Sequence, residues 1–270
     1  MSHARLVWLN GELVPAVEPR LSAFDRGFAL GDGVFETIRA RGRRLLWFHD
    51  HLARLRNGAA LLDIPMLFAD VAIEEGLGAL LAASGQPESA LRLTLSRGPS
   101  DRRGLWPADD PAKPTLLAAI APLGPTSAPL RLAITAITRR NEHSPLSRVK
   151  SLNYGDNLLA RKDAVRRGMD DALMLNSKGS IACATVANFF LRVDGRWRTP
   201  PLSDGALPGL ARQRLLSVLD VEEKAISPVD LPRATAAFLS NSLGISEIRE
   251  IEGYPLPDSK GLSQRLSIFE

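Results

Sequence analysis

The chain has few of the residues that build metal sites and covalent cross-links. It holds 270 residues but a single cysteine, Cys183, and only four histidines. One cysteine excludes a disulfide within the chain and argues against a thiolate metal site. Such sparing use of cysteine is usual in a reducing compartment, so we expect a cytoplasmic protein.

Long apolar runs and charge clusters are also missing. No stretch approaches the roughly 20 apolar residues that span a bilayer, and the opening MSHARLVWLNGELV lacks the apolar core of a signal peptide. We therefore expect no membrane association. The formal net charge is +4, with arginines dispersed along the chain. This balance attracts small anions weakly and does not indicate a nucleic-acid partner.

Several common catalytic signatures are absent as well. The sequence contains neither G-x-x-x-x-G-K-[ST] nor G-x-G-x-x-G, and no G-x-S-x-G nucleophile turn. His49 and His51 stand two residues apart without acidic or cysteine ligands at suitable spacing, which is a poor arrangement for zinc. We expect both to be partly exposed residues at the start of a helix. A lysine is then the best candidate for a reactive group.

Strand and helix patterns mix without a regular alternation, which favours an α+β fold. Asn10-Gly11 and Asp194-Gly195 each separate two short runs and predict hairpins. Residues 91–96, LRLTLS, alternate like a half-buried strand. Helical spacing relates Phe48, Leu52, Leu55, Ala59 and Leu62.

The stretch APLGPTSAP, residues 121–129, is the best candidate for an interdomain linker. We therefore expect a small N-terminal domain over 1–120 and a large cofactor-binding domain over 130–270. The polar loop at 97–114 is long enough to suggest a functional role.

Lys150 lies directly before a helical pattern, in SRVKSLNYGDNLLARKDAVRRG. A lysine amine attacks carbonyls only after losing its proton, and burial or a nearby cation lowers its pKa toward neutrality. Arg148 is close in sequence, and Val149 and Leu152 are apolar. These neighbours suit a reactive amine, but they equally suit a strand-end lysine whose head lies in water.

Five ordered blocks favour the reactive amine. They are DRGFALGDGVFETIR (25–39), HLARL (51–55), RVKSLNY (148–154), ANFF (187–190) and TPPLSDGALPGLAR (199–212). Together they resemble the fold-type IV pyridoxal-phosphate enzymes, also called class IV aminotransferases, over nearly the whole chain. The resemblance is closest to the 4-amino-4-deoxychorismate lyase-like members.

The resemblance implies a two-domain α+β fold, with a small N-terminal α/β domain and a larger C-terminal β-barrel-like domain with flanking helices. It implies pyridoxal 5′-phosphate as the cofactor, and a homodimer in which a loop, here 97–114, closes the partner's active site. Lys150 would join the cofactor covalently and then move the substrate's α-proton. The cofactor-binding residues would be Arg54, Lys150, Tyr154, Cys183, Gly209, Leu210, Ala211 and Ser242.

The roles of Arg54, Tyr154 and Ser242 each have a structural alternative. Arg54 would hold the phosphate through its forked guanidinium, or would decorate a helix face. The amides of 209–211 would bind the phosphate at a helix start. Tyr154 would contact the ring hydroxyl or fill the core, and Ser242 would add a hydroxyl or be an ordinary turn residue.

The sequence departs from the family pattern at two positions. A glutamate usually pairs with the pyridine nitrogen and keeps it protonated, but Cys183 stands at this position, in IACATVANFF. A thiol near its unperturbed pKa of about 8.5 is a poor counter-ion for a pyridinium, so electron withdrawal from the substrate should be weaker. Ala211 replaces a common threonine, which keeps the backbone donor and removes a hydroxyl.

The resemblance leaves two reactions open. A transaminase returns the α-proton to the cofactor carbon, whereas the lyase expels pyruvate as its product becomes aromatic. Aromatisation supplies driving force, so the lyase would tolerate weaker electron withdrawal, and the turn in FLSNSLGI is typical of lyase-like members. We therefore predict a 4-amino-4-deoxychorismate lyase that forms 4-aminobenzoate and pyruvate. An aminotransferase for D-amino or branched-chain amino acids is one alternative, and a degenerate cofactor-binding module without turnover is another.

Four further residues are candidates for substrate contacts. Thr37 would relay a proton to the leaving group, or is simply a β-branched strand residue. Arg97 and Arg102 are candidates because a guanidinium pairs well with a carboxylate. Phe35 is the remaining candidate for substrate binding.

Overall fold

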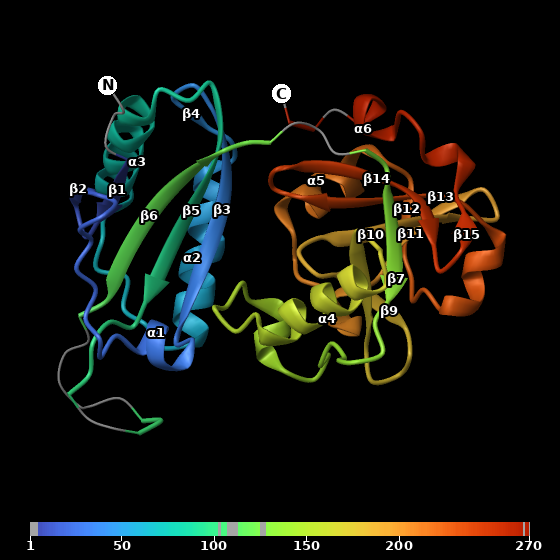
Figure 1. The fold of residues 1–270 in the computed structure, drawn as a ribbon, viewed down its shortest axis with the longest axis horizontal. Helices are drawn as coiled ribbons and strands as arrows, with labels where there is room; N and C mark the ends of the chain where they lie inside the picture. The colour runs from blue at the N-terminus through green and yellow to red at the C-terminus, as the bar shows by residue number, and fades with distance from the viewer. Residues whose placement is uncertain (1–4, 102–103, 107–112, 125–127, 267, 270) are drawn as a thin grey trace. The chain divides into compact units, whose positions relative to one another are not determined.

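The computed structural model describes residues 5–101, 104–106, 113–124, 128–266 and 268–269. It divides into two compact units, each with its own sheet (Figure 1). The N-terminal unit comprises Met1–Gly124 and Lys150–Asn153, and the C-terminal unit comprises Pro125–Val149 and Tyr154–Glu270.

The N-terminal unit is built on a six-stranded antiparallel sheet of order β2-β1-β6-β5-β3-β4. Its strands are β1 (Leu6–Leu9), β2 (Glu12–Pro15), β3 (Gly33–Arg41), β4 (Arg44–Leu45), β5 (Glu88–Ser96) and β6 (Thr115–Pro122). Its helices are α1 (Arg26–Leu30), α2 (Phe48–Leu61) and α3 (Asp70–Ser84). The hairpin predicted at Asn10-Gly11 is confirmed: β1 pairs with β2, and both turn residues have positive φ, 51° and 105°.

One face of this sheet is covered by helices, with α2 on β3 and α3 on β1, β2 and β6 (Figure 1). Because side chains alternate along a strand, every second residue of β3 and β5 faces these helices. The buried apolar side chains of the layer include Val34, Ile38, Leu91, Leu93 and Leu95 from the strands and Leu52, Leu55 and Ala59 from α2. Glu36 projects to the same face and is also fully buried.

The C-terminal unit is built on a nine-stranded sheet of order β12-β11-β10-β13-β14-β7-β8-β9, with β15 paired to β14. Its strands are β7 (Leu130–Ile134), β8 (Asp171–Leu175), β9 (Ile181–Ala184), β10 (Asn188–Val193), β11 (Arg196–Thr199), β12 (Val221–Glu223), β13 (Ala234–Asn241), β14 (Gly244–Ile251) and β15 (Tyr254–Pro255). Its helices are α4 (Gly155–Arg166), α5 (Leu210–Val218) and α6 (Leu262–Arg265).

The core of this unit lies against the central strands. Phe189, Leu191, Leu239 and Ile248 are buried there with aliphatic side chains from β7 and β8. Helix α4 packs on β8 through small residues, Ala160 and Ala164, which allow a close approach. The hairpin predicted at Asp194-Gly195 is confirmed by the pairing of β10 with β11.

The segment 150–153 groups with the N-terminal unit, whereas the expected domain limits assigned it to the C-terminal one. The reason is strand pairing along the edge of β3. The N–H of Phe35 donates to the carbonyl of Lys150, and the N–H of Leu152 donates to the carbonyl of Gly33, both at 2.9 Å. The first unit ends at Gly124, inside the expected linker, because β6 continues to Pro122.

No helix within the described ranges has both the length and the apolar character needed to cross a membrane. Nor do the described His, Cys, Asp and Glu residues form a group of three that could hold a metal ion.

Candidate functional site

Lys150 is half-buried beside strand β3. Its Nζ atom lies 4.2 Å from the centre of the Phe35 ring, which is a cation–π distance. Burial lowers the pKa of Lys150 from 10.5 to about 8; Glu36 opposes the change, and Arg54 and Arg92 add to it. With a pKa of about 8, an appreciable fraction of the amine is uncharged and nucleophilic near neutral pH.

Arg54 is held by a carboxylate that the sequence analysis did not single out. Its Nε and Nη2 atoms donate to the two oxygens of Glu36, at 2.8 and 2.7 Å. A bidentate pair of this kind fixes the plane of the guanidinium. Arg54, Glu36 and Lys150 belong to the same unit, so the expected phosphate ligand and the expected reactive amine share one electrostatic environment.

The face of the sheet opposite the helices carries Phe35, Thr37 and Arg92. Thr37 stands opposite Arg92 in the β3–β5 register and is half-buried. The guanidinium carbon of Arg92 lies 3.7 Å from the centre of the Phe35 ring. The Phe35 ring thus contacts two cationic side chains, Arg92 and Lys150.

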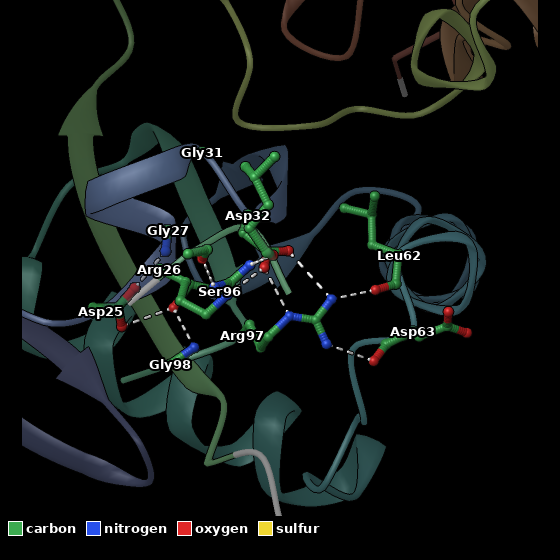
Figure 2. A network of polar contacts seen from close by, with 12 residues as sticks. Asp25, Arg26, Gly27, Gly31, Asp32, Leu62, Asp63, Ser96, Arg97 and Gly98 are labelled. Atoms are coloured by element: carbon green, nitrogen blue, oxygen red, sulfur yellow. Dashed lines mark hydrogen bonds and ion pairs between the residues drawn. The ribbon is translucent and has the colours of Figure 1, made fainter. Parts of the chain in front are cut away.

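The guanidinium of Arg97 is hydrogen-bonded to other residues of the N-terminal unit (Figure 2). Its Nε donates to Asp32 at 2.7 Å, its Nη1 donates to the carbonyl of Asp63 at 2.9 Å, and its Nη2 donates to the carbonyl of Leu62. The guanidinium thereby binds the carbonyls at the end of α2 as well as a carboxylate. Substrate binding by Arg97 would have to compete with these contacts. Arg102 lies outside the described residues.

The Asp32 carboxylate is shared with a second arginine (Figure 2). Arg26 donates its Nε to Asp32 at 2.8 Å, and its Nη1 and Nη2 donate to the carbonyls of Gly104 and Leu105 at 3.1 and 2.6 Å. Arg26 therefore ties the described part of the 97–114 loop to helix α1.

In the C-terminal unit, helix α5 begins without a side-chain cap. Gly209 is its N-cap residue, and Leu210 and Ala211 are buried. A Cβ atom on residue 209 would lie 2.1 Å from Oδ1 of Asn188, so a larger residue there would force the Asn188 side chain to move. The first amides of a helix have no partner within the helix, and an anion readily supplies one. Gly209, Leu210 and Ala211 thus form a helix start whose amides have no side-chain cap.

Tyr154 and Ser242 lie elsewhere in that unit. Tyr154 is the N-cap residue of α4 and is half-buried, which does not suit a purely core role. Ser242 lies in the turn between β13 and β14 and is also half-buried.

Cys183 is a buried free thiol on β9, opposite Met174 of β8. Burial raises the pKa of Cys183, with Arg140 opposing and Asp171 adding to the rise. The side chain is therefore a neutral thiol at neutral pH. It has no negative charge with which to hold a pyridine nitrogen protonated.

Taken separately, the two units supply the groups that a phosphorylated aldehyde needs. The N-terminal unit offers a half-buried amine of lowered pKa and a fixed guanidinium. The C-terminal unit offers a helix start without a side-chain cap, at Gly209. These donor groups fit pyridoxal 5′-phosphate, which supplies an electron-withdrawing ring next to the substrate's α-carbon once it is bound.

Sequence reasoning missed Glu36 and misjudged His51. The expectation that both histidines are partly exposed is wrong for His51, which is fully buried, with Nδ1 2.7 Å from Oε2 of Glu36. His49 is exposed. The available signal was spacing, because His51 and Arg54 are three residues apart and therefore lie on one helix face.

Comparison with known proteins agrees with this geometry. The profile of the family described as amino-transferase class IV matches residues 33–251. A candidate branched-chain-amino-acid aminotransferase of Methanocaldococcus jannaschii is 32% identical over 92% of this chain and 88% of its own length. The aminodeoxychorismate lyase of Bacillus subtilis is 29% identical over 78% of this chain and 72% of its own.

A solved structure gives the same result. The crystal structure of a candidate 4-amino-4-deoxychorismate lyase from Legionella pneumophila superposes with a TM-score of 0.85, at 30% identity, over 93% of this chain and 94% of that one. The expected fold-type IV architecture is confirmed. The chain belongs to the class IV amino-transferase family, whose cofactor is pyridoxal 5′-phosphate.

Proposed function

We propose that this enzyme eliminates pyruvate from 4-amino-4-deoxychorismate and releases 4-aminobenzoate. Lys150 is the amine that joins the cofactor and afterwards carries the substrate's α-proton. Arg54 and the amides of 209–211 hold the phosphate, as the resemblance implies. Thr37, on the same face of β3 as Phe35, passes a proton to the leaving group.

The observation that carries the choice of reaction is the neutral, buried thiol of Cys183. A thiol in place of a carboxylate leaves the pyridine nitrogen without an anionic partner, so the cofactor withdraws electrons less strongly. Elimination gains driving force from aromatisation of the product, whereas transamination has no such help. The weaker electron withdrawal also slows return of the proton to the cofactor carbon.

The side chains around Lys150 support proton transfer and carboxylate binding. The amine has a pKa of about 8, close to the range in which a general base works best. The Arg92 guanidinium, which lies against the Phe35 ring beside that amine, is suited to a substrate carboxylate. We keep Phe35 as a substrate contact and Arg102 as a second candidate for the carboxylate.

The deciding experiment supplies 4-amino-4-deoxychorismate to the holoenzyme and follows 4-aminobenzoate and pyruvate together. Equal amounts of both products, absent with Lys150→Ala, support the proposal. Loss of substrate without 4-aminobenzoate would refute it. Cofactor attachment is checked first, by the absorbance of the bound cofactor and its loss on borohydride treatment.

An aminotransferase is the second candidate, favoured by the 32% identity with the M. jannaschii protein. A panel of D-amino and branched-chain L-amino acids with keto-acid acceptors tests it. Rapid turnover on that panel without aminobenzoate formation would select the aminotransferase. Cofactor binding without turnover on any substrate would select the degenerate module. From the resemblance we also propose that the protein is a homodimer, which sedimentation equilibrium tests. We further propose that it is located in the cytoplasm.

A further inference from the structure

Glu36 is a buried carboxylate that binds two side chains of one helix. It accepts from Nε and Nη2 of Arg54 at 2.8 and 2.7 Å, and its Oε2 lies 2.7 Å from Nδ1 of His51. Burial would raise the pKa of Glu36, but the hydrogen bonds from Arg54 and His51 lower it, so the carboxylate is ionised. A charge inside an apolar layer persists only with partners such as these.

His51 is the unusual member of the cluster. Burial lowers the pKa of His51 despite the opposing effect of Glu36, so the ring is neutral. Because an ionised carboxylate can only accept, the ring proton lies on Nδ1. Within the described ranges, Nε2 is then a buried lone pair that makes no hydrogen bond. An unpaired buried acceptor is destabilising. The ring therefore makes one hydrogen bond, from Nδ1 to Glu36, and leaves its second nitrogen unpaired.

The same carboxylate acts on the reactive amine. The charged groups acting on Lys150 are Glu36 from β3, Arg54 from α2 and Arg92 from β5. Both arginines favour loss of the proton, and Glu36 favours its retention. The position and charge of the Glu36 side chain therefore influence the phosphate-binding guanidinium and the amine together.

Building on the proposed function, we infer that Glu36 and His51 are positioning residues for cofactor attachment. His51 holds the Glu36 carboxylate in the rotamer that clamps Arg54, and the clamped guanidinium is the one that receives the phosphate. The charge of Glu36 tunes the neighbouring Lys150 amine. Neither residue is assigned a contact with the reacting atoms, since both act through Arg54 and Lys150.

A pair of His51 variants separates positioning from packing. His51→Leu fills the space without a donor, and His51→Gln restores an N–H that can reach Glu36. The apo-proteins of both variants and of the wild type are titrated with pyridoxal 5′-phosphate, and their melting temperatures are recorded. We expect His51→Leu to weaken cofactor binding about 10-fold, the cost of one lost charge-assisted hydrogen bond, and His51→Gln to recover most of it. Equal affinities in both variants and the wild type would overturn the inference.

A second measurement needs no cofactor. Competitive acylation of Lys150 in the apo-protein, read by mass spectrometry at several pH values, gives the pKa of the amine. Glu36→Gln removes the nearby negative charge and should lower that pKa by about one unit. Asp70→Asn is the matched control, because it breaks the Arg56–Asp70 pair at the surface of the same region. An unchanged Lys150 pKa in Glu36→Gln would refute the coupling.

The two arms also distinguish this inference from the proposed function. If the wild type takes up no cofactor, the proposed function fails, while the acylation measurement still tests the link between Glu36 and Lys150. If the cofactor binds and His51→Leu behaves like His51→Gln, only the positioning role is lost.

Discussion

The backbone of Lys150 is joined to Phe35 by a hydrogen bond of 2.9 Å, and its Nζ atom lies over the ring of the same residue, 4.2 Å from its centre. The reactive amine is thus placed by strand pairing and by its contact with the ring, not by a free loop. The amine placed in this way loses solvation, and that loss lowers its pKa, with Arg54 and Arg92 adding to the change.

The pH dependence of cofactor attachment should reflect that lowered pKa. Only the uncharged amine attacks an aldehyde, so the rate at which the apo-protein joins pyridoxal 5′-phosphate should rise with pH around a midpoint near 8. The measurement is stopped-flow absorbance across the neutral and alkaline range, with Lys150→Ala as the blank. A midpoint at the ordinary lysine value of 10.5 would contradict the buried environment.

The stability of the apo-protein should depend on pH through the same group. Because the folded pKa lies below the unfolded one, the unfolded chain binds more protons between about 8 and 10.5, and stability rises with pH over that window. Lys150→Met removes this term. Urea denaturation should therefore show the variant more stable than wild type below pH 8, with the difference shrinking as pH approaches 10.5.

Cys183→Glu should strengthen electron withdrawal by supplying the missing carboxylate. We expect the half-reaction that converts an amino acid to a keto acid to speed up by about 10-fold or more, equivalent to ~1.4 kcal/mol of barrier. Cys183→Ser, which stays neutral, serves as the control and should leave the rate near that of wild type. Single-turnover absorbance measures the rate, and an unchanged rate in Cys183→Glu would remove the argument for the lyase.

Gly209→Ala should impair phosphate binding. The added Cβ would lie 2.1 Å from Asn188 Oδ1, which displaces Asn188 from its bond to the carbonyl of Leu207. We expect about 10-fold weaker cofactor binding, the equivalent of one lost hydrogen bond. Gly78→Ala is the matched control: its Cβ meets nothing within 4 Å on α3, so it should add ~0.5–1 kcal/mol of stability and leave binding unchanged. Cofactor titration and urea denaturation together test both variants.

Arg97→Ala should act on stability more than on catalysis. The variant loses the bonds to Asp32 and to the end of α2, and the hydrogen bond to the half-buried, charged carboxylate alone is worth about 1.5–3 kcal/mol. Asp32→Asn should destabilise too, and the double variant should fall short of the sum, since the two residues share one contact. Melting temperatures and KM are compared, and a raised KM at wild-type stability would restore the substrate role of Arg97.

The contacts of Asp32 with Arg97 and Arg26 predict that the stability of the protein falls at acid pH. The Asp32 carboxyl is desolvated, which raises its pKa, but the hydrogen bonds of Arg97 and Arg26 lower it below the ordinary 3.8 overall. Its stabilising contribution is therefore complete above that value and is lost as pH falls through the lower, folded pKa. Acid unfolding followed by circular dichroism should show this loss in wild type and not in Asp32→Asn.

Local chemistry explains which elements the sequence predicted. Asn10-Gly11 and Asp194-Gly195 adopt positive φ at their turns, and these residue types do so at little steric cost. Helix α3 was not predicted, although Ile73, Leu77 and Leu80 recur at helical spacing, because two glycines interrupt the pattern. What supports α3 is burial of that stripe against the sheet, which the local sequence does not reveal.

The candidate site was predicted where motifs carry it and missed where segments meet. Lys150, Arg54 and Gly209 lie within recognisable blocks, so they were named from the sequence. Glu36 and His51 depend on β3 lying against α2, a pairing that no single stretch encodes. The partners of Arg97 likewise come from two separate segments, Asp32 and the pair Leu62–Asp63.

The insertion of residues 150–153 into the first sheet makes the chain pass between the two units three times, after Gly124, Val149 and Asn153. If the polypeptide were divided at Gly124, the N-terminal fragment would lack residues 150–153, which pair with β3. Lys150 would then be part of the C-terminal fragment, apart from Glu36 and Arg54. The N-terminal fragment would then have an unpaired stretch of β3, so we expect it to self-associate when it is studied in isolation.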